Sequence, residues 1–117
     1  MGGKSSRDKG LNFERSICEM LRPYYPQAKR HLESQSQEAF GVDIDNSGQY
    51  KIQCKCTAKV PNIPQVFKEF KDQSQINVVI FKVTNKGTYA AFRVEDALKL
   101  MQYGELHANV VGEKETK

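Results

Sequence analysis

Two runs of alternating polar and apolar residues flank the segment Asn46-Ser47-Gly48. A period of two places successive side chains on opposite faces of a strand, and Asn and Gly are favoured in tight turns. We therefore expect a β-hairpin with arms at residues 42–45 and 49–56. One face of this hairpin carries the apolar side chains of Val42, Ile44, Ile52, Cys54 and Cys56, and the other carries Asp43, Asp45, Lys51, Gln53 and Lys55.

Helix and strand patterns surround the hairpin on both sides. Apolar residues at helical spacing predict a helix from about residue 11 to residue 22 that buries Phe13, Ile17, Met20 and Leu21. The remaining patterns predict strands at 27–33, 76–83 and 88–94 and helices at 64–73 and 95–101. The resulting order, α-β-β-β-α-β-β-α, indicates an α/β sandwich built on a central mixed β-sheet flanked by helices.

The length of 117 residues suits one domain with one core. We expect a flexible basic arm at residues 1–8, the folded domain at 9–104 and a polar tail at 105–117. No apolar run approaches the roughly 20 residues that span a bilayer, so no membrane partner is expected. The N-terminus also lacks the apolar segment of a secretory signal, which favours a cytoplasmic protein.

Charge and cysteine usage restrict the function classes further. A formal net charge of +4 is compatible with a polyanionic partner. The odd number of cysteines argues against a disulfide framework, and buried reduced thiols are the favoured interpretation. Zinc binding by Cys18, His31, Cys54 and Cys56 is disfavoured, because their spacing fits no common zinc motif. No glycine-rich phosphate loop occurs, so no nucleotide cofactor is expected.

Glu14 interrupts an apolar row of the first predicted helix, formed by Leu11, Cys18 and Leu21. A carboxylate on a buried face is costly unless it is paired or bound to a metal ion. A helix that covers the polar face of the hairpin would bring Glu14 towards Asp43 and Lys55. Acidic oxygens beside a lysine suit a site that holds a hard cation and polarises water. Without Glu14, a hairpin with its polar face in water would be the simpler interpretation.

Two short motifs carry a resemblance to a known family. Gly41-Val42-Asp43 followed by Gln53-Cys54-Lys55 resembles the signature of the PD-(D/E)XK nucleases. The segment Lys9-Gly10-Leu11-Asn12-Phe13-Glu14 is similar to the start of the archaeal Holliday-junction resolvases. The resemblance spans about residues 9–100 in element order. It implies a restriction-endonuclease-like three-layer sandwich and a Mg²⁺-dependent endonuclease of branched DNA, with Mn²⁺ as a substitute. It also implies a homodimer in a bacterial, archaeal or phage-infected cell, acting in recombination, repair or phage DNA processing.

The same resemblance assigns roles to individual residues. Mg²⁺ would be held by Asp43, Glu14, the side-chain oxygen of Gln53 and the backbone carbonyl of Cys54. Lys55 would orient the attacking water or stabilise charge on the phosphate. Gln53 stands where the family pattern has an acidic residue, and Asp45 or Glu38 could restore that charge. The residues expected to contact DNA are Lys4, Arg7, Lys9, Lys29, Arg30 and Lys59.

Two other functions remain open at the level of the sequence. The first is a catalytically degenerate DNA-binding module of the same fold, in which Gln53 marks a decayed site. The second is a general α/β scaffold with an amphipathic hairpin, which would have no preference for branched DNA. An Asp43→Asn substitution separates the first alternative from a nuclease, since only the nuclease has cleavage to lose.

Overall fold

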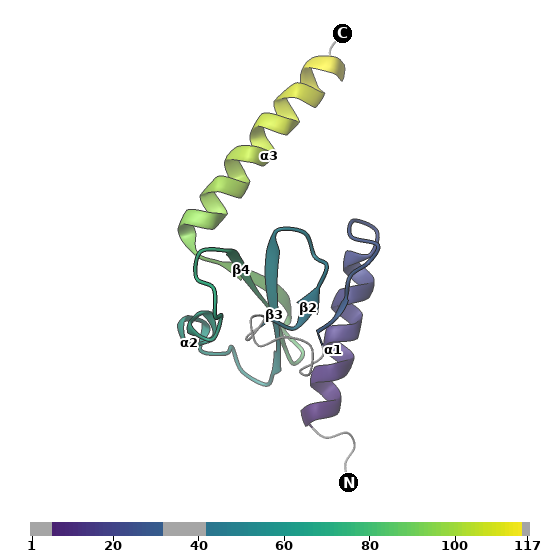
Figure 1. Ribbon diagram of the computed structural model, residues 1–117, viewed down its shortest axis with the longest axis vertical. Coiled ribbons are helices and arrows are strands. Elements are labelled where there is room, and N and C mark those ends of the chain that lie inside the picture. Colours follow the sequence, from purple (N-terminus) through teal and green to yellow (C-terminus); the bar gives the residue numbers. More distant parts are fainter. Residues whose placement is uncertain (1–5, 32–41, 116–117) are drawn as a thin grey trace.

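The computed structural model of the chain describes residues 6–31 and 42–115. Helices and strands in these ranges follow one another as shown in Figure 1. They are α1 (Ser6–Leu21), β1 (Lys29–Arg30), β2 (Ile44–Asp45), β3 (Tyr50–Thr57), α2 (Ile63–Lys68), β4 (Ile76–Val83), β5 (Gly87–Phe92) and α3 (Val94–Glu115).

The strands form one five-stranded sheet in the order β1-β2-β3-β4-β5. β3 and β4 are parallel, with Gln53 beside Val79, and the other neighbouring pairs are antiparallel. A parallel pair needs a crossover connection, which here contains α2. The predicted α/β class with a mixed sheet is therefore confirmed.

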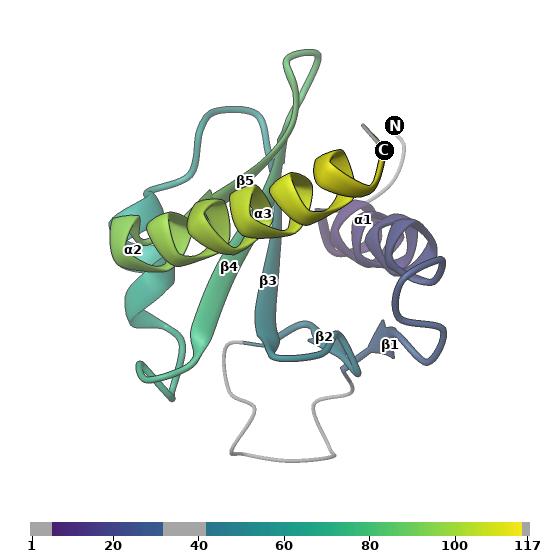
Figure 2. The same cartoon turned by 90° about the horizontal axis from the view of Figure 1, so that it is seen from above.

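α1 and α2 pack on opposite sides of the sheet (Figure 2). On one side, Phe13, Ile17 and Cys18 of α1 meet the apolar face of the hairpin at Ile44 and Ile52. On the other side, α2 contributes a second cluster of buried residues, consisting of Val66, Phe70 and Val79. α1 therefore covers the apolar face of the hairpin, and the expectation that it covers the polar face is wrong. Burial of matching apolar surfaces explains this choice, because it removes the most hydrocarbon from water.

The predicted hairpin is present, with Ile44 paired to Ile52. Asn46 and Gly48 both have positive φ, of 62° and 70°, as a tight turn requires. The alternation fails at its first residues, because Val42 packs with the α2 cluster and Ile44 with the α1 cluster. Val42 and Ile44 therefore do not share a face, and the residue between them leaves the regular pleat.

Several element boundaries differ from the predicted ones. α1 begins at Ser6, inside the segment predicted as a flexible arm, and Met20 on this helix is 65% exposed rather than buried. β1 spans only two residues instead of the predicted 27–33. α2 ends at Lys68, because the Gln73 side chain donates to the carbonyls of Phe67 and Phe70 and so caps the helix early.

α3 is far longer than the predicted helix at 95–101 and runs through most of the segment predicted as a polar tail. It extends away from the sheet in Figure 1. Among the described elements, α3 makes no extensive contact with another one. Its first turn is held by Arg93, which donates to the Asp96 carboxylate and to the carbonyl of Gln75. No helix in the described ranges has the length and apolar character needed to cross a membrane.

Candidate active site at the start of the hairpin

Asp43 lies between two strands and is bonded to both. Its backbone N–H donates to the carbonyl of Ile52 (2.8 Å), and its carbonyl accepts from the N–H of His31 (2.7 Å). Its side-chain Oδ2 accepts from the backbone N–H of Cys54 at 2.7 Å. In a regular ladder, a backbone carbonyl would accept this N–H bond. The Asp43 carboxylate therefore points towards the backbone of β3. It does not project from the polar face of the hairpin, as strict alternation would predict.

The surroundings of Asp43 disfavour its negative charge. The pKa of the Asp43 carboxyl is raised from 3.8 to about 6, mainly by burial and to a smaller extent by the Glu14 carboxylate. The N–H of Cys54 and the positive charges of Lys55 and His31 act in the opposite direction. Glu14 and Lys55 therefore both lie within electrostatic range of Asp43, although they come from different elements. A buried carboxyl with a raised pKa among charged neighbours is typical of a functional site.

Gln53 lies in β3 between the two residues that bond Asp43, and it is 5% exposed. Its Nε2 donates to Oε1 of Glu69 at 3.1 Å, which fixes the orientation of the amide. Its Oε1 is buried and has no hydrogen-bond partner among the described residues. A buried oxygen without a donor calls for an explanation such as a bound ion.

Glu69 is a member of this site that sequence reasoning missed. Its Oε1 also lies 3.7 Å from Nζ of Lys55, so one carboxylate on the α2 side holds both Gln53 and Lys55. The available signal was an acidic residue within the predicted helix at 64–73. The contact itself depends on how the crossover packs on the sheet, which no local pattern reveals.

Glu14 approaches Asp43 from the α1 side of the sheet. Its Oε1 accepts from Nε of Arg30 at 3.2 Å, and both side chains are largely buried. Arg30, expected to contact DNA, is therefore engaged with Glu14. Glu14 lies on one side of the sheet and Gln53 with Lys55 on the other, and Asp43 lies between the strands that separate them.

Asp45, expected as a substitute for the missing acidic residue, pairs with His31 instead. Its two carboxylate oxygens lie 3.0 and 3.1 Å from Nδ1 of His31. Nε2 of His31 is buried without a partner in the described part of the chain. The other proposed substitute, Glu38, lies outside the described residues.

The structure describes the side chains of only some of the residues that are expected to contact DNA. Lys9, Lys29 and Lys59 are exposed, on α1, on β1 and after β3. Lys4 lies outside the described residues, and the side chain of Arg7 is likewise not described.

The cysteines are all free, with Cys18 and Cys54 buried. Burial raises the pKa of both thiols, so the neutral form is favoured. Within the described ranges, no group of three or more His, Cys, Asp or Glu side chains could hold a metal ion.

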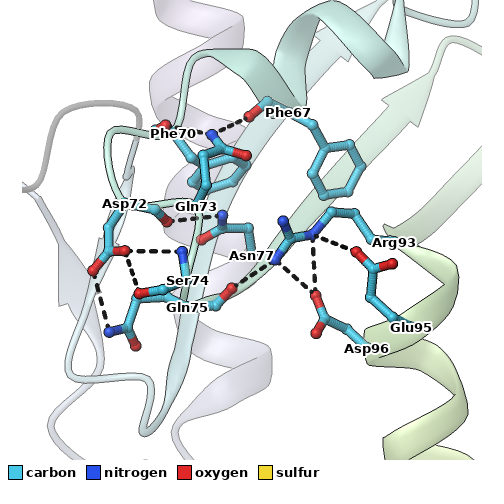
Figure 3. A network of polar contacts seen from close by, with 10 residues as sticks. All are labelled: Phe67, Phe70, Asp72, Gln73, Ser74, Gln75, Asn77, Arg93, Glu95 and Asp96. Atoms are coloured by element: carbon cyan, nitrogen blue, oxygen red, sulfur yellow. Dashed lines mark hydrogen bonds and ion pairs between the residues drawn. The ribbon is translucent and has the colours of Figure 1, made fainter.

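A cavity of about 340 Å³ opens beside the site on the α2 side, and its lining includes Tyr50, Lys51, Lys71, Asp72 and Asn77. Figure 3 shows the hydrogen bonds that shape one wall. Asp72 accepts from Ser74 and Gln75, and Nδ2 of Asn77 donates to the Asp72 carbonyl. These bonds hold the loop before β4 in one conformation.

No protein-family model matches this chain, and neither a curated protein nor a solved structure matches it.

The donors near Asp43 suit a small, hard cation. They comprise the Asp43 carboxylate, which accepts from the N–H of Cys54, and the Glu14 carboxylate. The third is Oε1 of Gln53, which follows Ile52 in β3 and has no donor among the described residues. Oxygen donors of this kind are those that Mg²⁺ prefers.

Proposed function

We propose that the protein is a metal-dependent endodeoxyribonuclease that hydrolyses phosphodiester bonds in branched DNA, similar to a Holliday-junction resolvase. The observation that carries this proposal is the juxtaposition at the start of the hairpin. There the partly buried Asp43 carboxyl, with its raised pKa, lies within electrostatic range of Lys55. Gln53 occupies the neighbouring position of β3, and its Oε1 has no donor in the described part of the chain. A three-layer sandwich of the restriction-endonuclease type is part of the same proposal.

Asp43, Gln53 and the backbone carbonyl of Cys54 would hold Mg²⁺ or Mn²⁺, with Glu14 as a direct or water-mediated ligand. The bound cation supplies a nucleophilic water at neutral pH and neutralises charge on the phosphate. The chain itself prepares the donors. Arg30 orients the Glu14 carboxylate, and the N–H of Cys54 fixes Oδ2 of Asp43.

Lys55 would stabilise the negative charge that develops on the scissile phosphate or orient the attacking water. Its contact with Glu69 is 3.7 Å long, and both side chains are about one-third exposed. Such an ion pair is weak enough to be exchanged for a phosphate oxygen. Glu69 is accordingly a positioning residue for Lys55 and Gln53.

DNA recognition would rest on contacts with the phosphate backbone, which exposed basic side chains can supply. Lys9, Lys29 and Lys59 are exposed and available for phosphates, together with Lys4 and Arg7 in the N-terminal segment. A four-way junction presents two strands for symmetric cleavage, which favours a homodimer with two sites.

The decisive experiment incubates the purified chain with labelled four-way-junction DNA and linear duplex DNA, in Mg²⁺, Mn²⁺ and EDTA. We expect paired nicks near the branch point that require the metal ion and disappear in Asp43→Asn and Lys55→Ala. Lys82→Ala, an exposed lysine on β4, serves as the matched control and should cleave normally. Equal cleavage of every substrate would retain the nuclease and remove the junction preference.

A DNA-binding module without catalysis is the second candidate. The neutral Gln53 amide, already bonded to Glu69, favours it, because an amide binds a hard cation less tightly than a carboxylate. Tight junction binding without cleavage in either metal would establish this candidate in place of the nuclease.

A further inference from the structure

A second cavity, of about 430 Å³, lies at the edge of the sheet, where α1 packs against the outermost strand β1 (Figure 2). Its lining consists of Arg15, Cys18, Glu19, Arg22 and Arg30. Three guanidinium groups therefore share one concave surface. Positive charges gathered in this way repel one another unless an anion lies between them.

Arg22 and Arg30 are each held in place through one nitrogen. Nε of Arg22 donates to the carbonyl of Ala28 at 3.2 Å, and Nε of Arg30 donates to Oε1 of Glu14 at the same distance. Among the described residues, no group accepts a hydrogen bond from the Nη atoms of either side chain. The fold thus orients both guanidinium groups and leaves their paired Nη donors for a ligand.

The carboxylates near the cavity do not neutralise its arginines. Glu14 pairs with Arg30 at 3.2 Å. Glu19 lies in the lining, yet it forms no ion pair within the part of the chain that the structure describes. Arg15 makes only a 3.5 Å contact with Asn12, at the outer limit of a hydrogen bond. With three arginines against two carboxylates, positive charge is in excess, which favours an anionic ligand.

The surroundings of Cys18 show that Arg22 and Arg30 lie near the same buried group. Burial raises the pKa of the Cys18 thiol, and the positive charges of Arg22 and Arg30 act in the opposite direction. Both guanidinium groups therefore lie within electrostatic range of this wall of the cavity, although one follows α1 and the other belongs to β1. Arginine binds phosphate groups well in such a place, because its planar fork donates two parallel hydrogen bonds.

We propose that this cavity binds one phosphate group of the DNA backbone, held jointly by Arg15, Arg22 and Arg30. The inference rests on the proposed function, since DNA is the partner, but it uses neither the metal site nor the cleavage step. Arg30 connects the two sites, because the same side chain holds Glu14 of the candidate active site. Phosphate contacts position a nucleic acid without reading its sequence. The cavity would thus fix the DNA backbone on the α1 side of the candidate active site.

Fluorescence anisotropy titrations of the full chain with four-way-junction DNA in EDTA, at several salt concentrations, test the proposal. Arg15→Gln and Arg22→Gln should each weaken binding about tenfold, as expected for the loss of a charge-assisted contact. Because the arginines share one phosphate, the double variant should reduce the slope of log affinity against log salt by about 1, whereas two independent contacts would reduce it by about 2. Lys82→Gln removes an exposed charge outside the cavity and is the matched control, with unchanged affinity and slope.

Folding of the variants is checked by thermal denaturation. Arg15→Gln removes only the long contact with Asn12 and should keep the Tm of the unmodified chain. Arg22→Lys keeps the charge but loses the planar fork, so it should restore the salt slope without restoring the full affinity.

Inorganic phosphate provides a second comparison, because it offers the same oxygens without DNA. If the arginine variants bind DNA normally but lose a rise in Tm that phosphate gives the unmodified chain, the cavity takes free phosphate and the proposal is wrong. Unchanged affinity in the arginine variants, or a slope change of about 2 in the double variant, would also overturn it. Absence of DNA binding by the unmodified chain would refute the proposed function as well, whereas unchanged binding by the variants refutes only the cavity.

Discussion

The Asp43 carboxylate makes a hydrogen bond that supports the fold, but its negative charge is unfavourable at this position. Its Oδ2 accepts from the N–H of Cys54 and so completes the hydrogen bonding of β3, yet burial raises its pKa to about 6. The fold therefore keeps a carboxylate at a position where a neutral acceptor would be more stable. Such a cost is expected where the charge is needed for function.

The first prediction concerns how the destabilisation caused by the Asp43 charge depends on pH. The folded-state pKa of Asp43 is about 6 and the ordinary value is 3.8, so the folded state binds more protons between these values. The contribution of Asp43 to stability is fully present below about pH 3.8 and is lost as pH rises through about 6. A shift of this size corresponds to a loss of about 3 kcal/mol.

Asp43→Asn should avoid this loss while its amide oxygen still accepts from Cys54. In EDTA near neutral pH, we expect the variant to be more stable than the unmodified chain by about 1–3 kcal/mol. The difference should vanish as pH falls below about 4. Urea denaturation at the two pH values measures both quantities. An equal stability difference at both pH values would show that burial of the Asp43 charge is not the cause.

The second prediction concerns Gln53. Gln53→Glu places a carboxylate against the Glu69 oxygen that now accepts from Nε2. In EDTA, we expect a loss of about 1–3 kcal/mol from this repulsion and the lost hydrogen bond. Mg²⁺ should raise the Tm of the variant more than that of the unmodified chain, since the added carboxylate binds a hard cation better. Thermal denaturation with and without Mg²⁺ measures this, with the exposed Gln49→Glu as control. A variant that is destabilised but gains nothing from Mg²⁺ would place the cation elsewhere.

Some residues of the candidate site could be predicted from the local sequence pattern. Strand alternation singled out Asp43, Gln53 and Lys55, and Glu14 was singled out as a carboxylate within an apolar row. The partners Glu69 and Arg30 were not predicted in these roles. Both contacts join residues 16 positions apart in the sequence and depend on tertiary packing. The in-plane direction of the Asp43 side chain was also not predictable, because it requires a break in the pleat.

At the scale of elements, Gly10 and Gly48 differ in their backbone conformation and in the space around them. Gly10 lies inside α1, with no described atom within 4 Å of the position a Cβ would take, apart from its near neighbours on the helix. Gly48 has a φ of +70°, and a Cβ there would lie 2.7 Å from Cε1 of Tyr25. The same chemical change should therefore have opposite effects at the two positions.

Gly10→Ala should stabilise the protein by about 0.5–1 kcal/mol, because Ala loses less entropy in a helix. Gly48→Ala should destabilise it by about 1–3 kcal/mol through backbone strain and the contact with Tyr25. Chemical denaturation of the two single variants gives both values. If Gly10→Ala were destabilising, α1 would not begin as early as Ser6.

The predictability of each element follows from its contacts. β4 was predicted with its observed bounds, Ile76–Val83, because a buried central strand is a continuous apolar run between polar residues. The early end of α2 depends on a side-chain cap from Gln73, which no local pattern reveals. The segment after residue 104 is rich in polar residues and ends in a charged run, and it therefore resembled a tail.

For the molecule as a whole, the distribution of positive charge bears on DNA binding. Lys9, Lys29 and Lys59 are exposed on elements that surround the hairpin. Lys99 is equally exposed but lies on α3, which extends away from the sheet.

Lys29→Ala should therefore weaken binding of branched and linear DNA alike. It should also reduce the slope of log affinity against log salt by about 1, as expected for one lost phosphate contact. Lys99→Ala should leave both the affinity and the slope unchanged. Fluorescence anisotropy titrations at several salt concentrations provide the comparison. An equal effect of the two variants would indicate that net charge alone, and not the hairpin side, attracts DNA.

The bond between Asp43 and Cys54 has a further consequence for how the chain reaches its fold. A hairpin with a two-residue repeat can shift its strands by two residues without turning any side chain to the wrong face. Such a shift would bring either Gly41, which has no side-chain acceptor, or Asp45 to the place of Asp43 beside the N–H of Cys54. A shift that used Asp45 would remove this residue from His31. The two carboxylates of the arm thus together distinguish the correct alignment of the strands from its nearest competitors during folding.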